Sequence, residues 1–154
     1  MTLQYAEHIF VFTGDAGYKT ERQFINSIDA ADFDFSGATV YLKIGHHGSN
    51  SSSYGDFLAL IQPDKAVICL GARNVYGFPH RLVLARLSQA GLEGQDIWRT
   101  SELGNIAVVV DERGERVYFA FDNQADLRAL WVLAFVSLIV LCFVNFRRTS
   151  LRGA

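Results

Sequence analysis

The sequence predicts an α/β fold, in which helices pack on a mixed β-sheet, followed by one membrane-spanning helix. Short apolar runs alternate with helical apolar patterns through the larger part of the chain, as is typical of this fold class. Two further apolar runs, separated by a charged turn, predict a β-hairpin. A long uncharged apolar stretch then follows near the C-terminus.

The expected elements follow one another in a regular order. Apolar runs rich in β-branched and aromatic residues predict the strands, and apolar residues spaced along one face predict the helices. A capping-box pattern beginning at Thr20 marks the start of the first helix, and Gly91 closes the third. The expected strands are 8–12, 38–44, 66–70, 96–100, 105–110 and 117–121, and the expected helices begin near residues 20, 54 and 81.

The stretch 127–146 is long and apolar enough to cross a membrane. A bilayer span needs about 20 mostly apolar residues, and the only polar side chain within residues 129–144 is Ser137. A very apolar core helix is the alternative, but such a helix usually keeps a polar stripe. Trp131 is placed as an interfacial anchor. We therefore expect a domain at 1–126, a transmembrane helix at 127–146 and a basic tail at 147–154.

This pattern predicts a single-pass membrane protein, with the side of the domain left open. The basic residues after the span favour a cytoplasmic C-terminus (Arg147, Arg148 and Arg152). A tail-anchored domain that faces the cytoplasm is equally compatible with the sequence.

The charge of the expected domain argues against one class of partner. Residues 1–126 contain sixteen Asp and Glu and ten Lys and Arg, which gives a net charge of −6. A domain that grips nucleic acid by its general charge is expected to be basic, so any phosphate binding must be local. The two cysteines, Cys69 and Cys142, are poor disulfide partners and lack zinc-finger spacing.

Three loops carry polar residues beside glycine, and each follows an expected strand. They are Thr13-Gly14-Asp15, Gly45 to Ser49, and Asn74 to His80. Open α/β sheets place ligands at the carboxyl ends of their strands. A carboxylate together with imidazoles suits zinc, or manganese when oxygen ligands are added. The pattern therefore predicts a site for one or two such ions, with a water between them as the nucleophile.

The adjacent histidines, His46 and His47, are expected to have different tasks. Neighbouring residues on an extended strand point to opposite faces, so one imidazole would face the metal. The other would contact the substrate or support a ligand from behind. Plainer explanations remain open: Asp15 occurs in a common turn sequence, the histidine pair could lie in a solvated loop, and His80 could cap the helix that follows it.

Taken in order, the motifs TGD, HHGS, NxYGxPH and RT resemble the second half of metallo-β-lactamase-fold hydrolases. The resemblance is greatest to the hydrolase domain of ComEC-type DNA-uptake proteins, and it covers roughly residues 9–110. It implies that the aspartate bridges the metals. It also implies metal ligands among Asp15, His46 and His47, catalytic roles for Asp15, His47 and His80, and substrate contacts from Ser49 and Asn74. Cations close to these loops in sequence are expected to hold phosphate, namely Lys43, Arg73, Arg81 and Arg99.

The chain departs from the family pattern at three points. Gly45 stands where the family often has proline, and Phe78 stands where it often has histidine. The HxHxDH-like metal motif of the family's first half does not occur in the sequence. The complete fold is an αββα sandwich of two sheets, whereas residues 1–126 supply one sheet and its helices. We therefore expect a C-terminal half with a free apolar face that lacks its partner layer. The N-terminal half would lie on another chain, be encoded by a preceding exon or reading frame, or have been lost.

The resulting hypothesis is a membrane-anchored part of a metal-dependent hydrolase. Its implied substrates are phosphoesters or nucleic acid, and it would need the missing N-terminal half for activity. The alternative is a non-catalytic, membrane-tethered remnant that uses the same fold to bind a partner. The absent first-half ligands favour this alternative, whereas the retained Asp15, His46, His47 and His80 favour the hydrolase.

Overall fold

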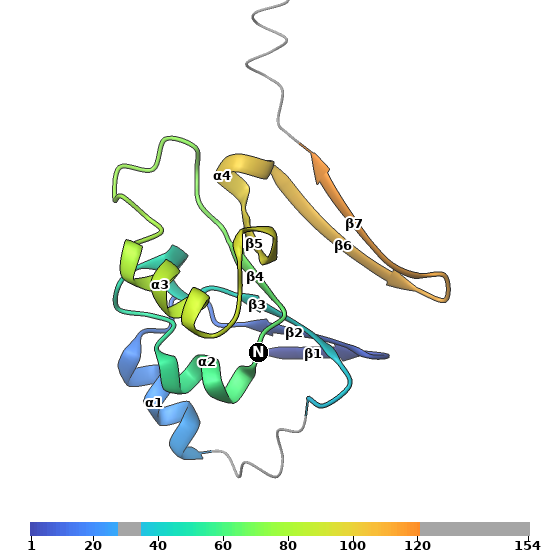
Figure 1. The fold of residues 1–154 in the computed structure, drawn as a ribbon, viewed down its shortest axis with the longest axis horizontal. Coiled ribbons are helices and arrows are strands. Elements are labelled where there is room, and N and C mark those ends of the chain that lie inside the picture. The colour runs from blue at the N-terminus through green and yellow to red at the C-terminus, as the bar shows by residue number, and fades with distance from the viewer. Residues whose placement is uncertain (28–34, 121–154) are drawn as a thin grey trace, which may run out of the picture. The chain divides into compact units, whose positions relative to one another are not determined.

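The computed structural model describes residues 1–27 and 35–120, which form two sheets and several short helices (Figure 1). The elements in chain order are β1 (Thr2–Tyr5), β2 (His8–Phe12), α1 (Tyr18–Ser27), β3 (Thr39–Lys43), η2 (Gly45–Gly48), α2 (Gly55–Ile61), β4 (Lys65–Ile68), α3 (Arg81–Gln89), η3 (Gly94–Asp96), β5 (Ile97–Arg99), α4 (Thr100–Leu103), β6 (Asn105–Asp111) and β7 (Gly114–Ala120). The expected transmembrane segment and basic tail lie outside the described residues. Within the described ranges, no helix is both long enough and apolar enough to cross a membrane.

The larger sheet has five strands in the order β1-β2-β3-β4-β5. β1 runs antiparallel to β2, and every other neighbouring pair is parallel. The predicted α/β fold with a mixed sheet is therefore confirmed. Because β2 to β5 are parallel, their carboxyl ends meet at one edge of the sheet, and the polar loops predicted from the sequence leave from that edge.

One face of this sheet forms the core together with the helices. The register places Ile9 beside Val40 and Val11 beside Leu42, and these four side chains are all buried. Helices α1, α2 and α3 lie on one side of the sheet (Figure 1). They contribute further buried or partly buried apolar side chains, among them Phe24, Leu58, Ile61, Val83 and Leu87. Full burial of each such side chain contributes about 1.5–3 kcal/mol.

The opposite face of the sheet is aromatic. Phe10 and Tyr41 are neighbours in the register, and their rings stack with centroids 4.8 Å apart. The Tyr41 ring also lies 6.0 Å from that of Trp98. Burial raises the pKa of the Tyr41 hydroxyl, and the Glu115 carboxylate adds to the effect. This face is thus apolar in its centre, as expected of a layer that packs against another.

The β6–β7 hairpin covers part of the aromatic face. Phe119 packs edge-on against Trp98 with centroids 5.7 Å apart, and Glu115 contacts His8 at 3.2 Å. The hairpin confirms the predicted pairing across residues 112–115, but it forms its own two-stranded sheet. Toward the outer strands the aromatic face stays exposed, at Leu3, Tyr5 and Phe12.

Two local predictions need correction. The capping-box interpretation at Thr20 is wrong, because α1 begins at Tyr18 and the Glu21 carboxylate bonds to the backbone N–H groups of Ser53 and Tyr54 instead. The strand expected to reach residue 44 ends at Lys43, so the two histidines do not belong to an extended strand.

Candidate functional site

The three polar loops meet at the carboxyl edge of the five-stranded sheet and enclose a pocket of about 500 Å³. This volume falls within the range of about 300–1,000 Å³ that is typical of small-molecule sites. The pocket is lined by Asp15, His46, His47, Cys69, Leu70, Gly71, Asn74, Tyr76 and Phe78. Four of the predicted site residues are therefore brought together: the aspartate, both histidines and the asparagine.

Main-chain contacts join the first loop to the second. The carbonyl oxygen of Gly14 accepts hydrogen bonds from the backbone N–H of His46 and from Lys43 Nζ, both at 3.1 Å. Gly45 has no room for a side chain, because a Cβ there would lie 2.6 Å from the carbonyl oxygen of Ala16. Glycine at this position therefore lets the first loop approach the histidine turn closely.

A second set of contacts joins the histidine loop to the third loop. The backbone N–H of His80 donates to the carbonyl of Gly48 at 2.8 Å. Gly48 has a φ of +84°, and a Cβ on it would lie 2.8 Å from Pro79 Cβ. Within the third loop, Asn74 Nδ2 donates to the Phe78 carbonyl at 2.8 Å, and the Phe78 N–H donates to Asn74 Oδ1 at 3.0 Å. Asn74 therefore shapes the pocket wall with both ends of its amide.

The two histidines share the pocket because of an unusual backbone. His46 and His47 have φ values of 45° and 53°, so both residues are left-handed in the turn η2. The expectation that they point to opposite faces of a strand is wrong, since that alternation holds only for extended backbone. Non-glycine residues with positive φ are uncommon and costly, and they cluster at functional sites.

His47 and Asp15 form the most informative pair in the pocket. His47 Nδ1–H donates to the carbonyl oxygen of Cys69 at 2.5 Å, and this bond leaves the lone pair of the neutral ring on Nε2. His47 Nε2 lies 3.6 Å from Asp15 Oδ1, which is too long for a hydrogen bond. Two ligand atoms on one tetrahedral zinc, at bond lengths of about 2.0–2.1 Å, are about 3.4 Å apart. The pair is thus spaced to share a cation, and both side chains are accessible.

The described residues bring two candidate metal ligands, Asp15 and His47, close together. Among residues 1–27 and 35–120, no group of three or more His, Cys, Asp and Glu side chains is placed to hold a metal ion. His46 Nδ1 is hydrogen-bonded to Ser51 Oγ at 3.4 Å, and its ring lies edge-on to Phe78 with centroids 6.1 Å apart. A metal ion held by Asp15 and His47 would therefore need further donor atoms beyond these two side chains.

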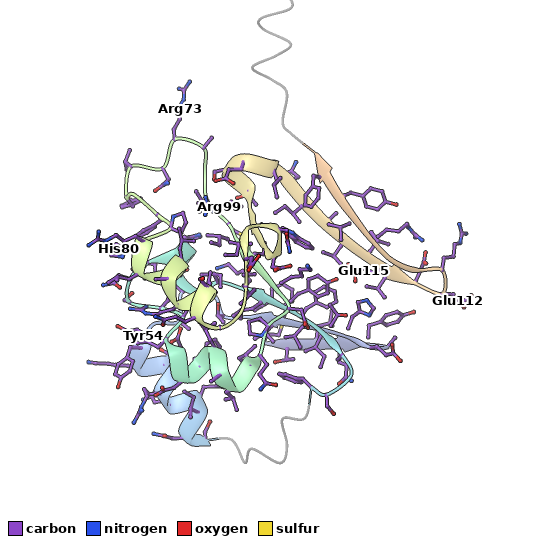
Figure 2. The ribbon with its side chains drawn as sticks, in the orientation of Figure 1. Tyr54, Arg73, His80, Arg99, Glu112 and Glu115 are labelled. Atoms are coloured by element: carbon purple, nitrogen blue, oxygen red, sulfur yellow. The ribbon has the colours of Figure 1, made fainter. Side chains whose placement is uncertain are left out.

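The other predicted site residues do not line the pocket. His80 Nδ1 accepts a 3.3 Å hydrogen bond from the N–H of Leu82 and so caps α3, as one of the plainer explanations predicts. Because Nδ1 is the acceptor, the neutral ring carries its proton on Nε2 and is a donor there. Ser49 Oγ contacts Ser51 Oγ at 3.1 Å. Arg73 extends from the third loop away from the sheet (Figure 2).

Several supporting contacts have little or no sequence signal. Thr100 Oγ1 donates to the carbonyl of Leu70 and accepts from the Leu70 N–H, each at 2.8 Å, which anchors one side of the pocket. Arg86 donates to the carbonyls of Asn50 and Ser52. The RT motif indicates Thr100, but no sequence pattern marks a main-chain acceptor such as the Cys69 carbonyl.

Three known proteins are similar to parts of this chain. ComE operon protein 3 of Bacillus subtilis is 32% identical over 97 residues, which are 63% of this chain and 11% of that protein. Recombination protein 2 of Haemophilus influenzae is 36% identical over 77 residues, 50% of this chain and 9% of that protein. Competence protein ComA of Neisseria gonorrhoeae is 34% identical over 84 residues, 53% of this chain and 11% of that protein.

The matched segment spans about a tenth of the length of these relatives. No protein-family model matches the chain, and no solved structure matches it. The metallo-β-lactamase fold therefore stays a prediction. The similarity to ComEC-type competence proteins, which the motifs indicate, is confirmed over roughly half of the chain.

Proposed function

We propose that the chain is part of a metal-dependent hydrolase of phosphoester bonds in a DNA-uptake system. The observation that carries this proposal is the Asp15–His47 pair, with 3.6 Å between its nearest ligand atoms. The hydrogen bond from His47 Nδ1 to the Cys69 carbonyl is the type of outer contact that orients histidine ligands in metal sites. Two of the relatives carry names that refer to competence or its operon, which supports DNA uptake as the setting.

In this proposal Asp15 and His47 hold zinc or manganese, alone or as part of a two-ion site. When bound, such an ion activates a water molecule near neutral pH and polarises the phosphoryl group. His46 lines the same pocket and would contact a phosphate oxygen of the substrate. Asn74 keeps the wall of the pocket in shape, because its amide is bonded at both ends to Phe78.

A second polypeptide segment completes the site. The outer part of the aromatic sheet face, at Leu3, Tyr5 and Phe12, is exposed, and exposed apolar patches often mark an interaction surface. An N-terminal half carrying an HxHxDH motif would cover this face and supply the remaining donors. The segment 127–146 would tether the assembly to the membrane.

The test is metal content and phosphodiesterase activity of the full chain, alone and co-purified with a polypeptide that carries an HxHxDH motif. Asp15→Asn should abolish metal binding and turnover in the complex. Asp56→Asn is the matched control, because the Asp56 side chain is 69% exposed and that of Asp15 is 66% exposed. A complex that contains no metal and cleaves no phosphodiester would end the proposal.

A partner-binding module without catalysis is the second candidate. It is favoured by the finding that the described residues bring no three metal donors together. If the chain is such a module, Asp15→Asn should leave the affinity for the partner polypeptide unchanged. The unchanged chain and its pocket variants should all lack phosphodiesterase activity.

A further inference from the structure

We propose that Tyr76 and Phe78, here called the aromatic wall, form a stacking surface for a base of single-stranded nucleic acid. This inference rests on the proposed phosphoester hydrolase function and assigns a substrate class to the same pocket.

The aromatic wall stands directly beside the candidate ligands. The Tyr76 and Phe78 rings have centroids 5.7 Å apart and planes inclined by 20°, which is a stacked arrangement. Phe78 in turn contacts the edge of His46, and both wall residues line the pocket with Asp15 and His47. A base on the wall would therefore place its own phosphate close to the ligand pair.

The outer ring of the wall is open to solvent. Tyr76 is 77% exposed although its ring is large and apolar. Phe78 lies offset beside the Tyr76 ring, with centroids 5.7 Å apart. Most of the Tyr76 side chain is therefore open to another flat ring. Base–aromatic stacking is tolerant of sequence, because every base has a π-face.

The wall is also held in place before any ligand binds. The two hydrogen bonds between Asn74 and Phe78 close the loop beneath the rings, and the Gly48 carbonyl holds the end of the loop through His80. A preformed wall loses little conformational entropy on binding, so more of the stacking energy is available as affinity.

The net charge of the domain favours recognition of a base by stacking over binding of the phosphate backbone. Residues 1–126 carry a net charge of −6, and neutralisation of many phosphates requires a basic surface. Arg73 is an exposed cation on the same loop and extends into solvent, where it can meet one phosphate (Figure 2). A duplex keeps its base faces stacked inside the helix, so the wall should select single strands.

The experiment measures binding of fluorescent oligonucleotides to the full chain by anisotropy, with a chelator present so that the probe is not cleaved. The probes are an oligothymidine of about eight nucleotides, an abasic deoxyribose-phosphate strand of equal length, and a duplex. The oligothymidine should bind about ten-fold tighter than the abasic strand and the duplex. Tyr76→Ala should remove this preference, whereas Tyr76→Phe should keep it.

Val75→Ala is the matched control, since Val75 is the neighbouring residue, is 89% exposed and carries no ring. Its affinities should equal those of the unchanged chain. Equal binding of oligothymidine and abasic strand, no binding of any probe, or a base preference that survives Tyr76→Ala would each overturn the inference. Because the chelator removes metal, these outcomes leave the hydrolase proposal standing. Conversely, if Asp15→Asn does not change the metal content, the hydrolase proposal fails. The preference for oligothymidine over the abasic strand would still be measurable.

Discussion

The carboxylate of Glu21, which is only 2% exposed in α1, accepts a 2.6 Å hydrogen bond from the backbone N–H of Ser53. Its other oxygen accepts a 3.0 Å hydrogen bond from the N–H of Tyr54, directly before α2. Arg86 holds the same segment from α3 through the carbonyls of Asn50 and Ser52. The serine loop, residues 49–53, is therefore fastened from two helices, and it leads directly out of the histidine turn.

Replacement of Glu21 by alanine should destabilise the domain. The change leaves the buried N–H of Ser53 and the partly buried N–H of Tyr54 without their acceptors, and a buried group of this kind costs about 1–3 kcal/mol. We expect a loss on the order of 2 kcal/mol in the free energy of unfolding, measured by urea denaturation. Glu112→Ala, at the exposed hairpin turn (Figure 2), is the control and should change stability by less than about 0.5 kcal/mol. Equal effects of the two changes would contradict this role.

Burial also makes Glu21 sensitive to pH. Burial raises the pKa of its carboxyl above the ordinary 4.5, although the N–H groups of Tyr54 and Ser53 and the nearby Arg86 partly oppose this. The folded state then holds the proton more tightly than the unfolded state. The contribution of Glu21 to stability is therefore greatest below pH 4.5 and falls as the pH rises through the folded pKa.

Glu21→Gln does not titrate at this position, so the comparison isolates the effect. The stability of the unchanged chain minus that of Glu21→Gln should decline as the pH rises from about 4 toward neutrality and then level off. Urea denaturation at a series of pH values measures this difference. A difference that grows with pH would show that the carboxylate is stabilised, not penalised, by its surroundings.

Arg86→Lys should loosen the serine loop without unfolding the domain. Arg86 reaches Asn50 and Ser52 with two different nitrogens and lies over the Tyr54 ring, 4.2 Å from its centroid. A lysine ammonium cannot reproduce this planar, forked contact. Amide hydrogen exchange across residues 49–54 should become faster by about ten-fold, as expected when about 1.4 kcal/mol of local stability is lost. Arg113→Lys, in the exposed hairpin turn, should leave this exchange unchanged.

Gly45→Ala tests whether close backbone packing sets the ligand spacing. Its Cβ would lie 2.6 Å from the Ala16 carbonyl oxygen, so the loop that carries Asp15 must move. We expect a loss of about 1–3 kcal/mol in stability and a weaker affinity for zinc in a competition titration. Gly55→Ala is the matched control, because a Cβ there meets nothing within 4 Å. If both variants bind zinc equally well, the glycine contact does not control the site.

The sequence predicts best those elements whose ends are fixed by residues within or next to the element itself. α3 is an example, because His80 caps its start and Gly91, with a φ of +93°, lies just beyond its end. β1 is missed, since the residues Thr2–Tyr5 show no strong apolar run and become a strand only by pairing with β2. α4 has only four residues, too few to produce a periodic pattern.

The candidate site shows the same division. Motif order correctly brings Asp15 and His47 together, because both follow parallel strands that end at one edge. The conformation of the histidine pair could not be predicted from side-chain type, since left-handed backbone at non-glycine residues is imposed by tertiary contacts such as that between His46 N–H and the Gly14 carbonyl. Both residues of the aromatic wall have a place in the motif analysis, Tyr76 within NxYGxPH and Phe78 as a departure from the family pattern. That their rings stack could not be predicted from it.

The carbonyl oxygens of Gly14, Gly48 and Cys69 each accept a hydrogen bond that joins two parts of the pocket. Carbonyls are present whatever the side chain, so they stay in place when the exposed residues of these loops are exchanged. The side chains of Val75 and Tyr76 can therefore be exchanged while Asp15 and His47 keep their spacing. A scaffold of this kind allows the surface beside the Asp15–His47 pair to be altered by single substitutions, in evolution or by design, without moving the pair.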